Sequence, residues 1–270
     1  AVTYNVQRMA CMAGLFYMAA MYCYVKGRTS LTGPQSIIYF ICCALSALLA
    51  FGSKENAFML PVALLLYDLI LIQSGENTGK RLKIGLLVIF FSGIAGLAYY
   101  HLAVGNFLSC LDNYSTRVFS LNERLLTEPR IIIFYMSLLL YPVPTRLSLV
   151  HDIPISSSLF APPGTILSMV CILGAFIASP FIFRKWPLVT YCTLFFFCYP
   201  VREASISPLE LVFEHRNYIP SMLFFLPVAI GILKGIDFYS NKKSMRSILI
   251  VFTALAIAGL GHSTYLRNFT

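Results

Sequence analysis

The segment FEHRNYIPS, Phe213–Ser221, combines charged and aromatic residues directly before a long apolar run. If a helix begins near Asn217, then Arg216 and His215 lie at its N-terminus, where free backbone N–H groups and the helix dipole favour an anion. The planar guanidinium of Arg216 suits a phosphate group. The segment therefore predicts a phosphate-binding site. The alternative is an interfacial Arg/Tyr anchor in which Glu214 pairs with Arg216.

Two further pairs of ionisable residues lie in expected connections. Lys54 and Glu55 occupy a short turn, SKEN, between two apolar runs. A carboxylate held at a membrane boundary is a candidate functional group, although a solvated turn with a snorkelling lysine is generally commoner. His151 and Asp152 are adjacent in LVHDIPISSSLF. They predict either a general base with its orienting carboxylate or, more simply, a turn in which Asp152 bonds to its own backbone.

The sequence contains no recognisable metal or nucleotide motif. There is no C-x-x-C pair, no H-E-x-x-H and no glycine-rich phosphate loop. Seven of the eight cysteines lie in apolar stretches, and only Cys110 falls in a polar loop. Cysteine of this kind behaves as a small buried hydrophobe. The sequence therefore identifies no metal site and no cofactor, and it leaves a requirement for a divalent metal open.

The elements that position these residues must lie in a bilayer. Of the 270 residues, 58% are hydrophobic and only 11% are charged, and the mean hydropathy is +0.77. A typical soluble domain has about 25% charged residues, so a water-soluble enzyme is excluded, and so is a disordered chain. The net charge of +9 comes from short basic clusters between apolar runs. That distribution is typical of a polytopic membrane protein and gives no reason to expect nucleic acid as a partner.

Eight apolar runs approach or reach the length that crosses a bilayer, about 20 residues. They are Tyr4–Val25, Ser36–Gly52, Ala57–Gln73, Ile84–Val104, Ile166–Phe183, Trp186–Pro200, Tyr218–Leu233 and Ser247–Tyr265. The run Ile131–Tyr141 is too short to cross, and Pro129, Pro142 and Pro144 bracket it. We therefore expect an all-α polytopic membrane protein, one domain over residues 1–270. Its outer segment 105–165 should contain a re-entrant or interfacial helical segment.

Basic residues predict the orientation, because loops rich in Lys and Arg stay in the cytoplasm. Four clusters fall on one side of the eight spans: Lys26/Arg28, Lys80/Arg81/Lys83, Arg184/Lys185 and Lys234/Lys242/Lys243/Arg246. Both chain ends are then outside. The outer face holds Arg8, Glu55, His151 and Arg216, so the candidate residues share one side of the membrane.

Four segments, in chain order, resemble those of one family: AVTYNVQRMACMAGLFYMAAMYCYVKGR (Ala1–Arg28), SKENAFMLPVALLLYDLIL (Ser53–Leu71), HDIPISSSLF (His151–Phe160) and FEHRNYIPS (Phe213–Ser221). The resemblance is to bacterial polytopic proteins with C-terminal tetratricopeptide repeats, relatives of the transmembrane-and-TPR O-mannosyltransferases in the GT-C superfamily. It implies an enzyme of the bacterial inner membrane that transfers a sugar from a polyprenyl-phosphate donor to a protein or glycan acceptor. The active face would be periplasmic. The chain would be a membrane core lacking the family's first span, its acidic outer loop and its repeats.

The resemblance also implies roles for residues. Arg216, Arg8 and His215 would bind the donor phosphate, and Glu55 would be an acidic catalytic residue, with the main base upstream of residue 1. Neighbouring side chains would support them, namely Lys54, Glu214, Tyr218, His151 and Asp152. Two other functions stay open, a non-catalytic scaffold subunit and a lipid or oligosaccharide transporter. The near absence of carboxylates from the spans disfavours the transporter.

Overall fold

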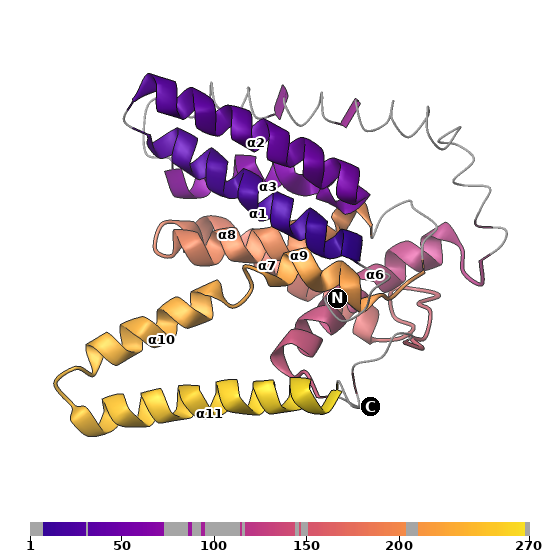
Figure 1. The fold of residues 1–270 in the computed structure, drawn as a ribbon. Helices are drawn as coiled ribbons and strands as arrows, with labels where there is room; N and C mark the ends of the chain where they lie inside the picture. Colours follow the sequence, from indigo (N-terminus) through magenta and orange to yellow (C-terminus); the bar gives the residue numbers. More distant parts are fainter. Residues whose placement is uncertain are drawn as a thin grey trace.

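The computed structural model describes residues 8–30, 32–72, 117–143, 151–203 and 210–267, and the short pieces 86–87, 93–94, 114 and 146. Every regular element among these residues is a helix, and they contain no strand (Figure 1). The prediction of an all-α protein is confirmed for this part of the chain.

Five helices of the described residues are long and apolar enough to cross a bilayer: α1 (Arg8–Thr29), α2 (Gly33–Ser53), the continuous segment Glu55–Ile72, α7 (Gly164–Phe183) and α11 (Lys243–Arg267). The segment Glu55–Ile72 consists of η2 (Glu55–Met59), α3 (Leu60–Tyr67) and η3 (Asp68–Ile72). A sixth span exists if η7 (Glu214–Asn217), α9 (Tyr218–Ser221) and α10 (Leu226–Phe238) are counted together across a bend of 46°. These helices indicate an integral membrane protein.

The described residues thus hold five or six candidate spans where eight were predicted over the whole chain. The predicted span Ile84–Val104 lies almost wholly outside the described residues. The run predicted at 186–200 forms α8 (Pro187–Cys198), too short to cross, followed by the 3-10 turn η6 (Tyr199–Arg202). The run predicted at 218–233 is broken between α9 and α10. Pro200 and Pro227 stand at these two breaks, and proline has no N–H for a helical hydrogen bond.

The segment between the two groups of spans differs from its prediction. Instead of a short helix bracketed by prolines, α6 (Leu121–Leu140) runs for 20 residues and contains Pro129. It begins at a capping box, in which the Ser120 hydroxyl accepts from Glu123 N and the Glu123 carboxylate accepts from Ser120 N. Proline is tolerated because the carbonyl left without its donor belongs to Leu125, which is exposed. The apolar run 131–141 is therefore the second half of a longer, partly polar helix.

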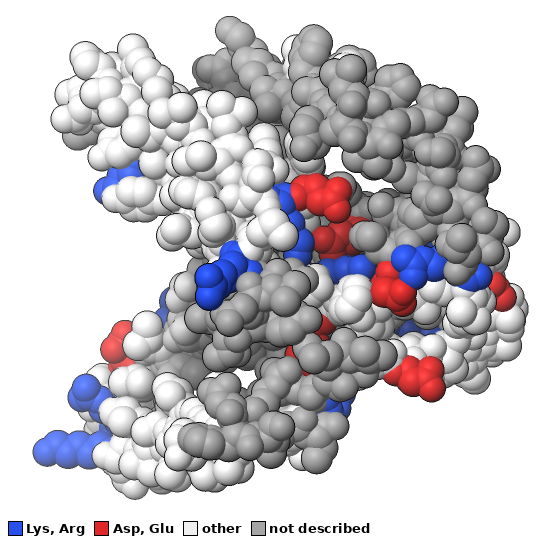
Figure 2. Space-filling model, turned by 45° about the vertical axis from the view of Figure 1, so that its right-hand side comes forward, with Lys and Arg blue, Asp and Glu red and all other residues white. Residues whose placement is uncertain are grey.

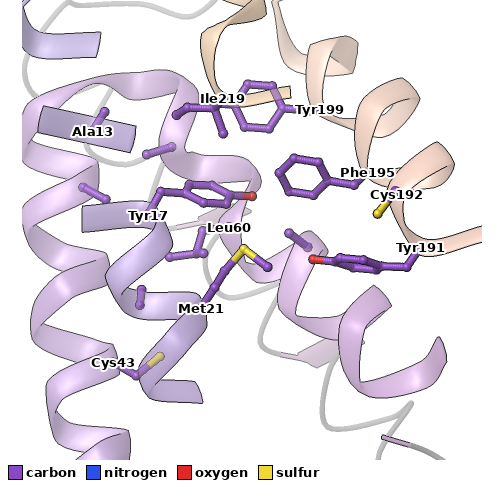
Figure 3. Close-up of a cluster of buried hydrophobic side chains, with 14 residues drawn as sticks. Ala13, Tyr17, Met21, Cys43, Leu60, Tyr191, Cys192, Phe195, Tyr199 and Ile219 are labelled. Atoms are coloured by element: carbon purple, nitrogen blue, oxygen red, sulfur yellow. The ribbon is translucent and has the colours of Figure 1, made fainter. Parts of the chain in front are cut away.

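A core of aromatic and aliphatic side chains joins α1, α3, α8 and α9. Figure 3 shows Tyr17 pointing from α1 toward Phe195 and Tyr199. The Tyr17 ring lies edge-on to both, with centroids 6.1 Å and 5.9 Å away, an arrangement that aromatic quadrupoles favour. Leu60 and Ile219 close the cluster from α3 and α9. This packing fixes the helices from which the candidate residues project.

The helices have two chemically different ends. At the first, which we call the Arg28 end, Arg28 Nε lies 2.6 Å from Asp68 Oδ1, and the Tyr24 hydroxyl donates to the same oxygen at 3.2 Å. Lys234 Nζ lies 5.3 Å from the ring centroid of Trp186 at the α7–α8 turn. The turns α1–α2, α7–α8 and α10–α11 all lie at this end, on the left of Figure 1. Three of the four predicted basic clusters therefore share it, and the fourth, at 80–83, lies outside the described residues.

A close helix approach near the opposite end leads to a first prediction. A Cβ atom added at Gly14 of α1 would lie 2.8 Å from Cε1 of Tyr218 and 2.7 Å from Cε of Met222. The methionine end can move, but the tyrosine ring packs against the core and must shift as a whole. We expect Gly14→Ala to lower the free energy of unfolding by about 1–3 kcal/mol, the usual cost of overpacking. Denaturant unfolding in detergent micelles measures it.

The matched control is Gly174→Ala in α7, because no heavy atom lies within 4 Å of a Cβ at that position. There the substitution should raise stability by about 0.5–1 kcal/mol, since alanine favours a helix interior over glycine. Equal effects of the two substitutions would show that α1 does not approach Tyr218 so closely.

Candidate functional site

Arg216 lies at the end opposite Arg28, which we call the Lys54 end, and it is only 9% exposed. Its Nε lies 3.4 Å from Oε2 of Glu203, and its Nη1 donates to the backbone oxygen of Glu210 at 2.6 Å. The guanidinium carbon lies 5.1 Å from the ring centroid of Phe213, a cation–π contact. Among the described residues, no hydrogen bond is made by its Nη2. Arg216 is thus held in place with one donor nitrogen still available.

The expected helix N-terminus beside Arg216 is weaker than predicted. The elements there, η7 and α9, have four residues each. A helix dipole needs several aligned turns, so one turn contributes little field. Anion binding at this place must come from side chains.

Lys54 is the second cation of the site. Its Nζ is buried and has no hydrogen-bond partner among the described residues. Burial lowers the pKa of this ammonium below its usual value, Glu203 and Glu55 oppose the change, and Arg216 adds to it. The neighbouring Glu55 is exposed. In the SKEN turn it is the lysine head that lies in the interior.

Helix α6 brings a buried ion pair to the same place. Arg124 is fully buried, and its Nη2 lies 2.7 Å from Oε1 of Glu128 and donates to the backbone oxygen of Glu203 at 2.8 Å. Burial raises the pKa of the Glu128 carboxyl to about 7, against the opposite effect of Arg124 and Arg216. Glu128 is therefore partly protonated near neutral pH.

Five residues thus form what we call the charged cluster: Lys54, Arg124, Glu128, Glu203 and Arg216. A cavity of about 10 Å³ lies against three of them, Glu128, Glu203 and Arg216, which is room for about one water molecule. Its walls are formed by Glu128, Ile132, Tyr135, Pro200, Glu203, Arg216, Asn217 and Pro220. Figure 2 shows acidic and basic side chains lying side by side near the middle and right of that view. A cavity of this size is too small for a ligand larger than water, so a larger ligand has to widen it.

The charged cluster carries an excess of positive charge. With Glu128 ionised it holds three cations and two carboxylates, a formal charge of +1, and with Glu128 protonated the charge is +2. Taking an ion out of water costs several kcal/mol unless a counter-charge offsets it. An anion at Lys54 and Arg216 would supply that counter-charge.

The His151–Asp152 dyad is not formed. Nε2 of His151 lies 3.3 Å from Oε1 of Glu214, and its ring packs edge-on against Phe134 with centroids 5.1 Å apart. Asp152 is exposed. Neighbouring side chains on an extended segment point in different directions, so Asp152 cannot orient the imidazole. The carboxylate in contact with His151 comes from η7 instead.

The remaining predicted residues, Arg8, Tyr218 and His215, do not line the cavity. Arg8 begins α1 and is exposed, and Tyr218 packs against Gly14 of the same helix. The ring of His215 stacks on Phe213 with centroids 5.1 Å apart. In the part of the chain that is described, no three His, Cys, Asp or Glu side chains are grouped to hold a metal ion.

Arg124, Glu128 and Glu203 are not among the residues predicted from the sequence. A signal for the first two was present: Ser120-Leu-Asn-Glu123 is a capping-box sequence, and a helix that begins there puts positions 124, 128, 131 and 135 on one face. For Glu203 we find no such signal, because it lies just after a 3-10 turn.

No family model matches the chain, and no curated protein or solved structure is significantly similar to it. The resemblance of its four short segments to GT-C glycosyltransferases therefore stays a prediction. Any functional argument has to come from the charged cluster and the membrane setting.

Proposed function

We propose that this chain is the membrane core of a glycosyltransferase that takes a sugar from a polyprenyl-phosphate donor. One observation carries the proposal: the buried ammonium of Lys54 has no hydrogen-bond partner among the described residues, and near it Nη2 of Arg216 makes no hydrogen bond to them. Buried donors are normally satisfied. Two cations with unused donors at the end of an apolar helix bundle are suited to the phosphate of a membrane lipid.

The membrane setting supports the class of ligand. A polyprenyl tail stays in hydrocarbon, while its phosphate lies at the boundary where the spans end. Lys54 lies between the candidate spans Gly33–Ser53 and Glu55–Ile72, which is such a boundary. Basic clusters at the opposite, Arg28 end favour that end for the cytoplasm. We therefore propose the periplasmic side of a bacterial inner membrane for the charged cluster.

The proposal assigns roles to the predicted residues. Arg216, in the wall of the cavity, and Lys54, within electrostatic range of Arg216, bind the donor phosphate, and Arg8 and His215 assist them. Glu55, exposed beside Lys54, orients the acceptor. Removal of its charge by Glu55→Gln should then slow transfer without weakening donor binding.

The test uses the full-length protein in detergent with a polyprenyl phosphate and a panel of polyprenyl-phosphate hexoses. We expect saturable binding and sugar transfer to an acceptor. Lys54→Gln should weaken binding by at least roughly tenfold, because a hydrogen bond to a charged group contributes about 1.5–3 kcal/mol. Lys242→Gln, in the exposed α10–α11 turn, is the matched control and should bind normally.

Absence of binding to every polyprenyl probe would contradict the proposal. Binding without transfer by the full-length protein would favour the two other functions, a scaffold subunit or a lipid transporter. Transfer that is unaffected by Lys54→Gln would remove Lys54 from the site.

A further inference from the structure

We propose that Glu128 takes up a proton when the sugar leaves the donor, so that the charged cluster stays balanced as the lipid phosphate gains negative charge. The inference rests on the proposed function and adds a residue and a protonation step to it. Glu128 acts through the charge of the cavity that it shares with Arg216. It is therefore a positioning residue that need not touch the sugar.

The reaction itself requires such compensation. The donor is a phosphodiester with one negative charge. When the acceptor oxygen bonds to the sugar, the acceptor O–H bond breaks, and the sugar–oxygen bond to phosphate breaks with its electron pair moving to the phosphate. The product is a phosphomonoester, whose second pKa is about 6. Each transfer thus adds about one negative charge at the phosphate and releases one proton.

The position of Glu128 suits this task. Its side chain is buried on α6, and its Oε1 makes no hydrogen bond, although Arg124 lies within ion-pair distance. The charged groups that face it are Arg124 on its own helix, Arg216 on η7 and Glu203 after η6. The Tyr135 hydroxyl, on the same helix, is already used, since it donates to the oxygen of Phe213 and accepts from its N–H.

Charge arithmetic distinguishes Glu128 from the other members of the charged cluster. With Glu128 ionised the cluster carries +1, which a phosphodiester neutralises. With Glu128 protonated it carries +2, which a dianionic phosphomonoester neutralises. Both forms are accessible near neutral pH because burial raises the pKa of Glu128 to about 7. Glu203 is held as the partner of Arg216, at 3.4 Å.

The experiment compares two soluble probes with one tail, farnesyl phosphate and its monomethyl ester, which differ by one charge. Their dissociation constants are measured on the full-length protein in detergent between about pH 6.5 and 8.5. Affinity for farnesyl phosphate should fall about tenfold over this range, the equivalent of one pKa unit. The methyl ester carries half the charge, so its affinity should fall only about threefold.

Glu128→Gln is a neutral isostere of the protonated residue. It should bind farnesyl phosphate at pH 8.5 about as tightly as the wild type does at pH 6.5, with little dependence on pH. Glu123→Gln is the matched control, because it removes a carboxylate from the same helix while glutamine still completes the capping box. It should behave as the wild type does.

A second test uses only the wild-type protein, so it does not depend on whether Glu128→Gln folds. Calorimetry in two buffers of different ionisation heat gives the number of protons taken up on binding. At pH 7.5, binding of farnesyl phosphate should take up more protons than binding of the methyl ester. If the cationic groups alone bound the phosphate, the phosphate would release its own protons, and the measurement would show net proton release. Equal uptake, or an unchanged pH response in Glu128→Gln, would overturn the role of Glu128 while leaving the proposed function intact. Failure of both probes to bind at any pH would overturn the proposed function instead.

Discussion

Arg216→Ala is expected to lower the turnover of the full-length protein by about 10²–10³-fold. Loss of one contact to charge that develops in a transition state costs about 2.7–4 kcal/mol. Arg216 would make that contact to the leaving phosphate through Nη2, while Glu203 and the Glu210 carbonyl hold its other nitrogens. A simple interfacial anchor would contribute about 0–1 kcal/mol. The two interpretations therefore differ by orders of magnitude in rate.

Arg216→Lys tests the geometry separately from the charge. Lysine keeps the positive charge that balances Glu203 but loses the planar fork, so turnover should also be impaired. Both variants are compared at matched membrane expression and with thermal unfolding of each, because removing a partner of Glu203 affects folding too. A loss below about threefold in both would leave Arg216 as an anchor and contradict its role at the phosphate.

The largest effect on stability is expected at Arg124. This guanidinium is fully buried and contacts both Glu128 and the backbone oxygen of Glu203. Removing one partner of a buried ion pair costs about 3–5 kcal/mol, because the other charge stays behind without compensation. We expect Arg124→Leu to lower the free energy of unfolding by that amount, measured by denaturant unfolding in micelles.

A second variant identifies the cause. The double substitution Arg124→Leu with Glu128→Leu removes both charges and should recover most of the loss, since apolar replacements of a buried pair are often neutral. Arg117→Ala is the matched control, because Arg117 pairs with Glu210 at an exposed position, where such pairs contribute about 0.2–1 kcal/mol. A double variant no more stable than Arg124→Leu would show that packing around Arg124, and not charge, is responsible.

Run length in the sequence predicted the long helices well but not the broken ones. The predicted spans at 36–52 and 166–183 correspond to α2 and α7 within a few residues, because an uninterrupted apolar run of that length buries itself in lipid as a helix. At 186–200 and 218–233 the composition was equally apolar, yet prolines interrupt the helical hydrogen bonds. A count of apolar residues does not detect these breaks, because proline in an apolar run does little to lower its hydropathy.

The helix α6 shows the reverse error. Its apolar half corresponds to the run predicted at 131–141, but its polar half was not predicted as part of the same helix, because charged residues lower the hydropathy there. The capping box at Ser120 and Glu123 predicts the helix start, and the fourfold spacing from Arg124 to Glu128 predicts that the two side chains share a face. For α6, the capping box and the i, i+4 spacing are therefore sufficient to predict the helix start and the Arg124–Glu128 pair.

The sequence by itself determined the membrane class, the helical architecture and the collection of candidate residues at one end, because span lengths and the alternation of spans follow from composition along the chain. Only the tertiary structure decided the partners. His151 meets Glu214, 63 positions away, and Arg124 reaches the backbone of Glu203, 79 positions away. Lys54 and not Glu55 has its head in the interior. The reason is physical: a sequence pattern specifies which face of one element is polar, whereas the pairing of buried charges depends on how α6, η6 and η7 pack. Those charges are stable only where packing brings an opposite charge within reach.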